Sequence, residues 1–167
     1  MKVKKDFRSF SQEEFGIAID LITEFEGFSS KPYLCPTGVL TIGYGHTAGV
    51  REGQHISEEG ARQLLVSDLL KFQEEIAPHI KVPVSLGQFS ALMSFAYNLG
   101  VSALAKSTLL KKLNEGKEKE ASEEFSRWVK AKVLKKQPDG TFKTAYIVLG
   151  GLVRRRDAER AVFDSED

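Results

Sequence analysis

Residues 26–46 read EGFSSKPYLCPTGVLTIGYGH, and this stretch determines how the rest of the chain must fold. Gly27 is placed to end the helix that precedes it, and residues 39–44 are rich in the β-branched and aromatic residues of strands. Between them, residues 35–38 have the proline and glycine spacing of a tight turn. One acid, one thiol, one hydroxyl and one imidazole are therefore gathered between a helix end and a hairpin, where we expect the functional site.

The composition indicates a single soluble domain. The chain has 167 residues, 41% of them hydrophobic and 28% charged, with a formal net charge of +1. A balance so close to neutral gives no overall attraction to nucleic acid. Residues 125–160 differ, with ten Lys or Arg against three acids, which is typical of a solvated face or of attraction to an anionic polymer. A single cysteine excludes an internal disulfide and suits synthesis in a reducing compartment.

The first residues, MKVKKDFRSFSQEEF, are basic but lack the apolar stretch of a signal peptide. No window of the sequence approaches the roughly 20 apolar residues that span a bilayer. We therefore expect a protein made soluble in the cytoplasm, without stable membrane insertion.

The helix that precedes residue 27 is predicted to place Glu26 in its last turn. Ser11 and Glu14 have the spacing of a capping box, and apolar residues then recur at helical intervals up to Phe25. The carbonyl end of the helix dipole opposes the charge of Glu26, and partial burial opposes it further. Both effects favour a carboxyl that stays protonated, as a general acid must be.

The remaining pattern is mostly helical. A short third strand is expected near residues 54–56, and Ser57 caps a helix that continues to about Pro78, long enough to bridge two lobes. A capping box, Ser85 to Gln88, begins a helix that is apolar nearly all round and should form the core. Shorter helices are expected over residues 102–106, 108–114, 119–130 and 152–163, with a hairpin or loop over residues 135–149.

Five ordered motifs resemble those of the phage-type lysozymes, the bacteriophage endolysins. Glu26 is followed after eight residues by Cys35 and after five more by Thr41, which opens the run TIGYGH. The other motifs are SFAYNLG at residues 94–100, STLL at 107–110, RW at 127–128 and GLVRRRDAE at 151–159. The resemblance covers most of residues 17–163.

The resemblance implies an α+β, mostly helical, lysozyme-like fold with two lobes, in one domain over residues 1–167. Residues 12–56 would form the first helix and a small antiparallel β lobe that carries the site. Residues 57–78 would form the connecting helix, and residues 79–167 the helical lobe.

The resemblance also implies hydrolysis of the β-1,4 bond between N-acetylmuramic acid and N-acetylglucosamine in peptidoglycan. Glu26 fits the acid that protonates the leaving oxygen, and Thr41 most simply hydrogen-bonds the attacking water. Cys35 stands where the family often has an aspartate. Because a thiol is mostly neutral at pH 7, its role stays open between positioning water, acting as a thiolate and acting as a nucleophile.

Further residues around the site are assigned by the resemblance. Asn98 and Tyr44 would contact the substrate, although Asn98 could equally cap its own helix, and His46 would be braced by Asp68 on the connecting helix. One arginine of the RRR run would reach Glu26, the alternative being a solvated run. The residues expected to support the site are therefore His46, Asp68, Arg155 and Arg156, with no metal and no cofactor.

Two other activities remain open. A lytic transglycosylase breaks the same bond with a lone glutamate, and the loss of a second carboxylate at Cys35 is consistent with it, whereas Thr41 at the family spacing favours hydrolysis. A non-catalytic module that binds the cell wall is the third possibility. The expected partner is the peptidoglycan glycan strand, with no nucleic acid. The resemblance further implies a monomer whose release depends on a membrane-permeabilising protein of the same phage.

Overall fold

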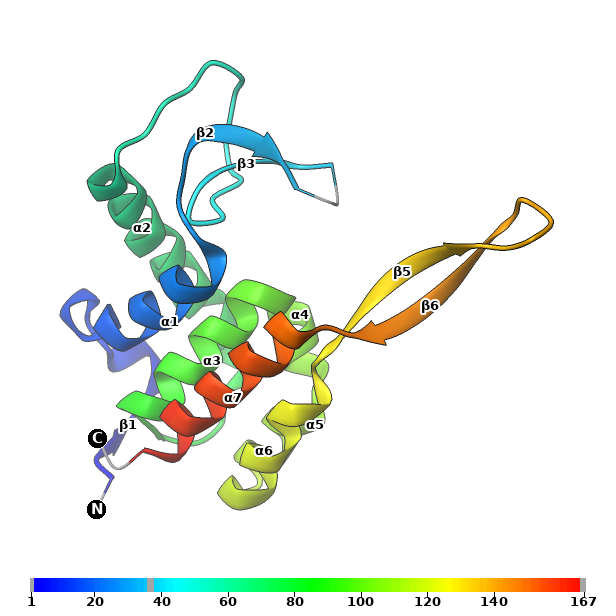
Figure 1. The fold of residues 1–167 in the computed structure, drawn as a ribbon. Helices are drawn as coiled ribbons and strands as arrows, with labels where there is room; N and C mark the ends of the chain where they lie inside the picture. Colours follow the sequence, from blue (N-terminus) through cyan, green and yellow to red (C-terminus); the bar gives the residue numbers. More distant parts are fainter. Residues whose placement is uncertain (1, 36–37, 166–167) are drawn as a thin grey trace.

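The computed structural model describes residues 2–35 and 38–165, and it shows two lobes joined by a long helix (Figure 1). The upper lobe contains the antiparallel hairpin of β2 (Ser29–Leu34) and β3 (Leu40–Gly43). The connecting helix is α2 (Glu58–Ile76), and the lower lobe is built around α3 (Leu86–Leu99) and α7 (Gly150–Asp164). This is the α+β, mostly helical, lysozyme-like arrangement that the motifs predicted.

The lower lobe also contains the shorter helices that follow α3 along the chain. The elements not yet named are β1 (Lys4–Lys5), η1 (Phe7–Ser9), η2 (Gln12–Phe15), α1 (Gly16–Glu26), η3 (Ala77–His79), β4 (Val84–Ser85), α4 (Val101–Lys106), α5 (Thr108–Asn114), α6 (Glu118–Glu124), η4 (Phe125–Arg127), β5 (Lys130–Lys136) and β6 (Phe142–Val148). In the part of the chain that the structure describes, no helix has the length and apolar character needed to cross a membrane.

Both predicted capping boxes are present. Ser11 and Glu14 close one around η2, which leads directly into α1, and Ser85 and Gln88 close the other at the start of α3. Gly27 ends α1 with a φ of 71°, a left-handed conformation that glycine adopts without a steric penalty. These local signals fix where Glu26 lies, because it is the last residue of α1.

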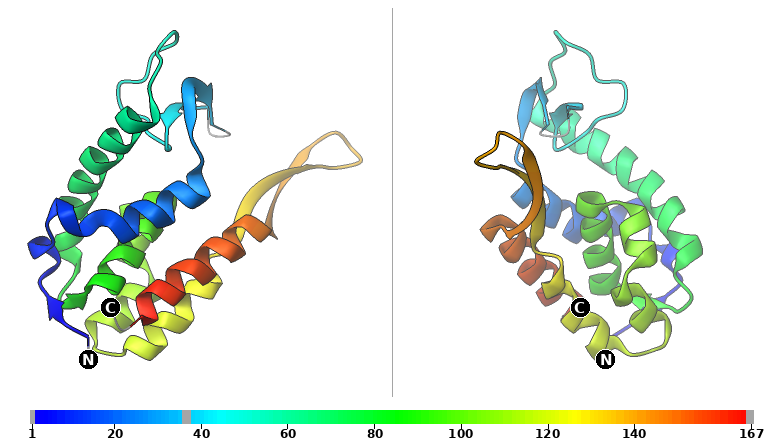
Figure 2. Two further views of the ribbon diagram at one scale, coloured as in Figure 1. Left: turned by 60° about the vertical axis from the view of Figure 1, so that its left-hand side comes forward. Right: turned by 90° about the vertical axis from the view of Figure 1, so that its right-hand side faces the viewer.

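The core of the lower lobe is centred on α3, whose residues from Gly87 to Ala96 are all buried. Phe7, Phe10 and Phe15 from the N-terminal segment place their rings 4.3–5.8 Å from the ring of Phe89. On another side, α7 runs beside α3, as both views of Figure 2 show. A helix that is apolar nearly all round is thus surrounded by other elements, as the pattern predicted.

Two predicted elements are wrong. Residues 54–56 form no strand, and Ile56 only donates its backbone N–H to the Ser30 carbonyl. The helix expected over residues 119–130 is shorter than predicted, and α6 and η4 together end at Arg127. From Val129 onward lysines alternate with apolar residues, and this period of two favours a strand. That alternation belongs to β5, which pairs with β6 in an antiparallel ribbon from Lys130↔Val148 to Lys136↔Phe142. The hairpin expected over residues 135–149 is confirmed, and it begins earlier than predicted.

Candidate active site

Glu26 lies at the end of α1, on the edge of a cleft of about 850 Å³ between α1, the end of α3 and the start of α7. Its side chain is 24% exposed, and its Oε1 atom lies 3.6 Å from Nη1 of Arg155 on α7. Asn98 at the end of α3 lines the same cleft. The structure therefore brings together three residues that lie far apart in the sequence, and it shows that Arg155 is the arginine that reaches Glu26.

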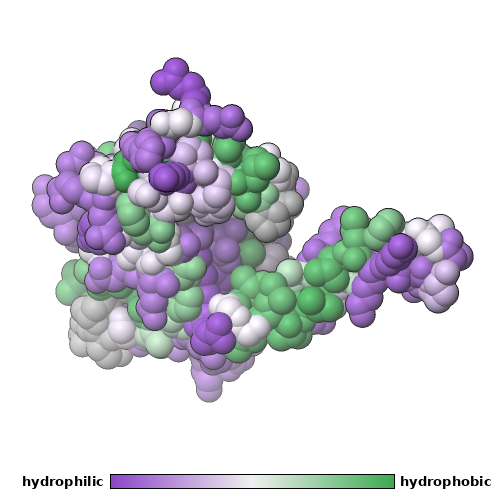
Figure 3. Space-filling model, turned by 45° about the horizontal axis from the view of Figure 1, so that its top comes forward, coloured by the Kyte–Doolittle hydropathy of each residue, from purple (hydrophilic) through white to green (hydrophobic). Residues whose placement is uncertain are grey.

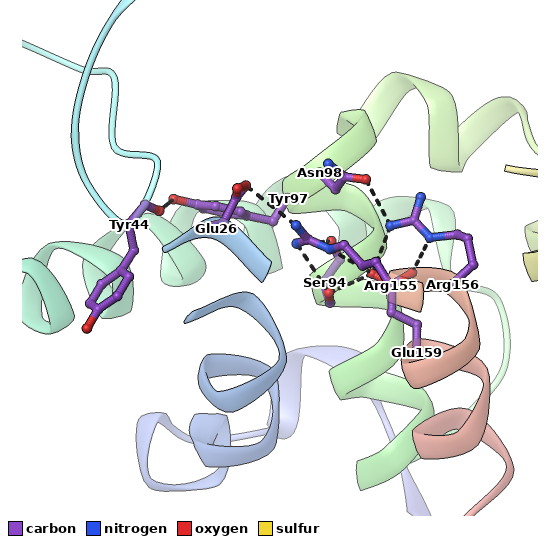
Figure 4. Close-up of polar contacts among 8 residues, drawn as sticks. All are labelled: Glu26, Tyr44, Ser94, Tyr97, Asn98, Arg155, Arg156 and Glu159. Carbon is purple, nitrogen blue, oxygen red and sulfur yellow. Dashed lines mark hydrogen bonds and ion pairs between the residues drawn. The ribbon is translucent and has the colours of Figure 1, made fainter. Parts of the chain in front are cut away.

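Arg155 is itself held by a buried polar network (Figure 4). Its Nη2 atom donates to the Ser94 carbonyl at 3.2 Å, and its Nε atom lies 3.4 Å from Oε2 of Glu159. The Ser94 hydroxyl donates to the same carboxylate oxygen at 2.6 Å. Since α3 and α7 supply these partners, the guanidinium that faces Glu26 has little freedom to move.

Arg156 points to the other side of Glu159 and supports Asn98. Its Nη2 atom donates to Oδ1 of Asn98 at 2.9 Å, and its Nε atom forms an ion pair with Oε1 of Glu159 at 2.6 Å. Burial raises the pKa of the Glu159 carboxyl, while the charge of Arg156 and the Ser94 hydroxyl hold it down. Glu159 and Ser94 were missed as site residues, because a single sequence does not show that positions 65 residues apart share a hydrogen bond.

Tyr97 and Gly45 pack directly beside Glu26. The Tyr97 hydroxyl donates to the Tyr44 carbonyl at 2.6 Å, and burial raises the pKa of this hydroxyl, so it remains a neutral donor. Gly45 has a φ of 82°, and a Cβ added there would lie 3.3 Å from the Tyr97 oxygen and 3.5 Å from Cδ of Glu26. The glycine therefore allows the backbone to approach the carboxyl closely.

The predicted substrate contact of Tyr44 does not fit the structure. Its residue is 7% exposed, its ring lies 5.6 Å from that of Phe28, and Figure 4 shows the ring directed away from Glu26. Positive φ angles at Gly43 (66°) and Gly45 turn the backbone on either side of Tyr44, so its carbonyl rather than its ring faces Tyr97. The ring is thus part of the core.

Cys35 and Thr41 lie on the β2–β3 hairpin and are not among the residues that line the cleft. Thr41 pairs directly with Tyr33, and Cys35 follows Tyr33 by two residues, so all three side chains share one face of the hairpin. Burial raises the pKa of the Tyr33 hydroxyl, and the charges of Glu26 and Cys35 raise it further. Tyr33 is therefore close enough to both groups for their charges to act on its hydroxyl.

The hydroxyl of Thr41 and the thiol of Cys35 differ in their surroundings. Thr41 is 3% exposed and donates its hydroxyl proton to the Val39 carbonyl at 3.1 Å. Cys35 is partly exposed and is a free thiol. His46 lies beyond them, with its Nδ1 atom 2.7 Å from Oδ2 of Asp68 and its Nε2 atom 2.8 Å from the Ala48 carbonyl. The predicted pairing of His46 with Asp68 is confirmed, and it ties the end of the hairpin to α2.

Two lobes joined by a long helix, with an acid at the end of α1 on the edge of a cleft, are the features of a lysozyme-type glycoside hydrolase. The family model described as Phage lysozyme matches residues 23–159. The chain therefore belongs to the phage lysozyme family.

Individual relatives agree with this assignment. The chain is 41% identical over 145 residues to the endolysin of Acyrthosiphon pisum secondary endosymbiont phage 1, covering 87% of this chain and 93% of the relative. It is 43% identical over 148 residues to the endolysin of Bacillus phage B103, which covers 87% of this chain but only about half (51%) of that relative. Among solved structures, the muramidase domain of SpmX from Asticaccaulis excentricus superposes with a TM-score of 0.77 at 35% identity, over 89% of this chain and 95% of that one.

Proposed function

We propose that this chain is a peptidoglycan hydrolase that cleaves the β-1,4 bond between N-acetylmuramic acid and N-acetylglucosamine and so lyses bacterial cells. The observation that carries the proposal is the position of Glu26, a partly exposed carboxyl on a cleft, fixed from one side by the buried Arg155. A single glycosidic bond needs one acid to protonate its leaving oxygen, and Glu26 has the geometry to do so.

The acid step uses the carboxyl oxygen that Arg155 leaves free. Arg155 approaches Oε1, so Oε2 is available to present the proton. The proton passes from Glu26 to the glycosidic oxygen as the bond between that oxygen and the anomeric carbon breaks, and the leaving sugar departs as an alcohol. Gly45 and Tyr97 pack against the carboxyl and restrict its position. An acid held in one place in this way favours the transition state, because less motion must be lost during reaction.

On the hairpin side, Thr41 and Cys35 would position or activate the water that attacks the anomeric carbon. The Thr41 hydroxyl donates to the Val39 carbonyl, which leaves its oxygen lone pairs free to accept a hydrogen bond from water. Cys35, on the same face, is the group that would assist the removal of the water proton or bind the water. Inverting and retaining outcomes are both compatible with this arrangement.

Asn98 is the substrate contact that the geometry supports. Its Oδ1 atom accepts from Arg156, so the amide must present Nδ2 as a donor elsewhere, and the residue lines the cleft. A donor at this place suits a sugar hydroxyl or an N-acetyl carbonyl. His46, Asp68, Arg155 and Arg156 would then act by positioning rather than by touching the sugar.

We also infer the biological setting from the family. The chain would act as a single-domain monomer, with residues 12–56, 57–78 and 79–167 as its three parts. It would be made in the host cytoplasm and reach the wall through a phage-encoded permeabilising protein. Neither a metal nor a cofactor is required by the residues proposed for the reaction.

A lytic transglycosylase is the second candidate, because Cys35 stands where a second carboxylate would be expected. The two reactions differ by one water, so mass spectrometry of peptidoglycan digested with the wild-type chain separates them. We expect reducing N-acetylmuramic ends. Anhydro products would assign the chain to the transglycosylases, and an absence of soluble fragments would remove both candidates.

A further inference from the structure

The β5–β6 ribbon projects from the lower lobe as an isolated two-stranded element, with no other strand paired to it in the described residues (Figure 1). Residues directly opposite each other in an antiparallel pair point to the same face. The register therefore assigns Lys130, Lys132 and Lys136 to the same face as Val148, Tyr146 and Phe142. We call this the outer face of the ribbon, and the opposite one the inner face.

Large apolar side chains are unusually exposed on the outer face. Leu134, Phe142, Tyr146 and Val148 are each between 57% and 68% exposed. Figure 3 shows hydrophobic residues running along the projecting ribbon, beside hydrophilic ones. A contiguous exposed patch of this kind, bordered by charged residues, is typical of an interaction surface. Transferring such apolar side chains from water into a contact with a partner lowers the free energy.

The lysines of the outer face are available for a partner. Among the described residues, no ion pair or side-chain hydrogen bond involves Lys130, Lys132 or Lys136, and all three are exposed. The ribbon also carries Lys135 and Lys143 on the inner face, against the single acid Asp139 at its tip. The ribbon is thus a strongly basic element on a chain whose net charge is only +1.

The outer face is not an extension of the cleft. Leu149 follows β6 in an extended conformation, donates its backbone N–H to the Val129 carbonyl, and lines the cleft. Because side chains alternate along a strand, Leu149 shares a face with Ile147, and Val148 points the opposite way. At the root of the ribbon the inner face therefore turns toward the cleft, and the outer face turns away from it. A glycan bound in the cleft leaves the outer face uncovered.

We propose that the outer face of the β5–β6 ribbon binds the surface of an anionic phospholipid membrane. The lysines would contact lipid phosphates, while Phe142, Tyr146 and the aliphatic side chains would enter the headgroup region. Aromatic rings with a polar atom and lysines with long apolar stems are suited to that boundary. A second copy of the chain fits less well, because lysines along an edge strand oppose pairing between strands. Binding of this kind lies flat on the membrane and needs no spanning helix.

The test measures co-sedimentation of the full chain with vesicles of phosphatidylcholine alone or mixed equally with phosphatidylglycerol. One variant combines Lys130→Gln, Lys132→Gln and Lys136→Gln. Its matched control combines Lys71→Gln, Lys106→Gln and Lys119→Gln, which removes the same charge from exposed positions outside the ribbon. A Tyr146→Trp variant reports entry into the headgroup region through a blue shift of its fluorescence.

We expect the wild-type chain to bind only the anionic vesicles, and to bind them less at high salt. The variant with the three ribbon substitutions, the ribbon triple, should bind these vesicles about 10²-fold more weakly. The affinity of the control variant, the control triple, should stay within about twofold of the wild-type affinity, since charges away from the contact contribute little to binding. Equal losses in both triples, no binding to anionic vesicles, or no blue shift would overturn the proposal. A ribbon triple that binds vesicles normally but loses affinity for purified peptidoglycan, or that loses a dimer seen by sedimentation velocity, would also overturn it, in favour of the wall polymer or of a second copy.

Discussion

Arg155 on the last helix holds Glu26 at the end of the first α-helix, with 3.6 Å between Nη1 and Oε1. Glu159 and Ser94 fix the guanidinium from behind, so the position of the proposed acid depends on residues buried in the lower lobe. The two sides of the cleft are thereby linked through one ion pair.

Replacing Glu26 by Gln should abolish lysis of bacterial walls, because the amide has no proton to give to the leaving oxygen. We expect the rate to fall by about 10²- to 10⁴-fold, the usual contribution of a general acid. The melting temperature should not fall, since Arg155 keeps Glu159 as a partner. Turbidity loss of wall suspensions measures the rate, and Glu24→Gln, which lines the same cleft from the same helix, is the control. Lysis retained in Glu26→Gln would refute the acid assignment.

Replacing Arg155 by Ala should lower kcat by roughly 10²-fold with a smaller change in KM, because a misplaced acid affects the reaction more than binding. Arg155→Lys should recover part of the loss. The comparison is made well below the melting temperature, since a buried arginine also contributes to stability. Arg154→Ala removes a charge from the same cleft and helix, yet Arg154 forms no ion pair with Glu26 among the described contacts. If both alanine variants lose kcat equally, Arg155 does not position the acid.

Local signals allowed much of this fold to be predicted. The capping boxes at Ser11 and Ser85, the stop at Gly27 and the period of α2 each depend on residues close together in the chain, and the structure confirms all of them. The place of Glu26 followed from the same signals. The resemblance to the phage-type lysozymes added the pairing of His46 with Asp68, which local patterns alone could not show.

Two of the errors arose where longer-range geometry decides. The ring of Tyr44 turns into the core because the glycines on either side adopt positive φ angles, and composition alone does not say which way such a turn directs a side chain. Glu159 looked like one acid in a basic run, although its partner Ser94 lies on another helix. The helix expected over residues 119–130 was extended into the start of β5, although the alternation of lysines and apolar residues there is a local signal for a strand.

Replacing Gly45 by Ala should reduce activity by more than its effect on stability explains. The new Cβ would lie 3.3 Å from the Tyr97 oxygen, so this hydroxyl must shift by a few tenths of an ångström, and it would be in van der Waals contact with Cδ of Glu26 at 3.5 Å. Gly49→Ala is the matched control, because Gly49 also has a positive φ (67°) but has open space around its Cβ position. Both variants should lose about 1–2 kcal/mol of unfolding free energy from backbone strain. Only Gly45→Ala should lower kcat; equal kcat in the two would show that the contact with Glu26 is unimportant.

Replacing Glu159 by Gln should destabilise the protein by about 3–5 kcal/mol, because it leaves two buried arginines without their shared carboxylate. Urea denaturation measures the free energy of unfolding. Glu123→Gln, which removes an exposed carboxylate, should cost less than about 0.5 kcal/mol. A loss at Glu159 no greater than at Glu123 would mean that the arginines find other partners and that the network does not support the cleft.

Cys35 is the position where substitutions distinguish between chemical roles. Cys35→Asp restores the acid that the family often has there, so we expect it to preserve a good part of the activity. Cys35→Ser keeps the size but loses the acidity of a thiol, and we expect at least a tenfold loss, roughly 1.4 kcal/mol in the barrier. Rates of wall lysis and mass spectra of the products are measured together for the three chains. If Cys35→Ser is fully active, the thiol has no chemical role, and the position needs only a small side chain. If Cys35→Asp alone changes anhydro products into reducing ends, the second carboxylate decides between transglycosylation and hydrolysis.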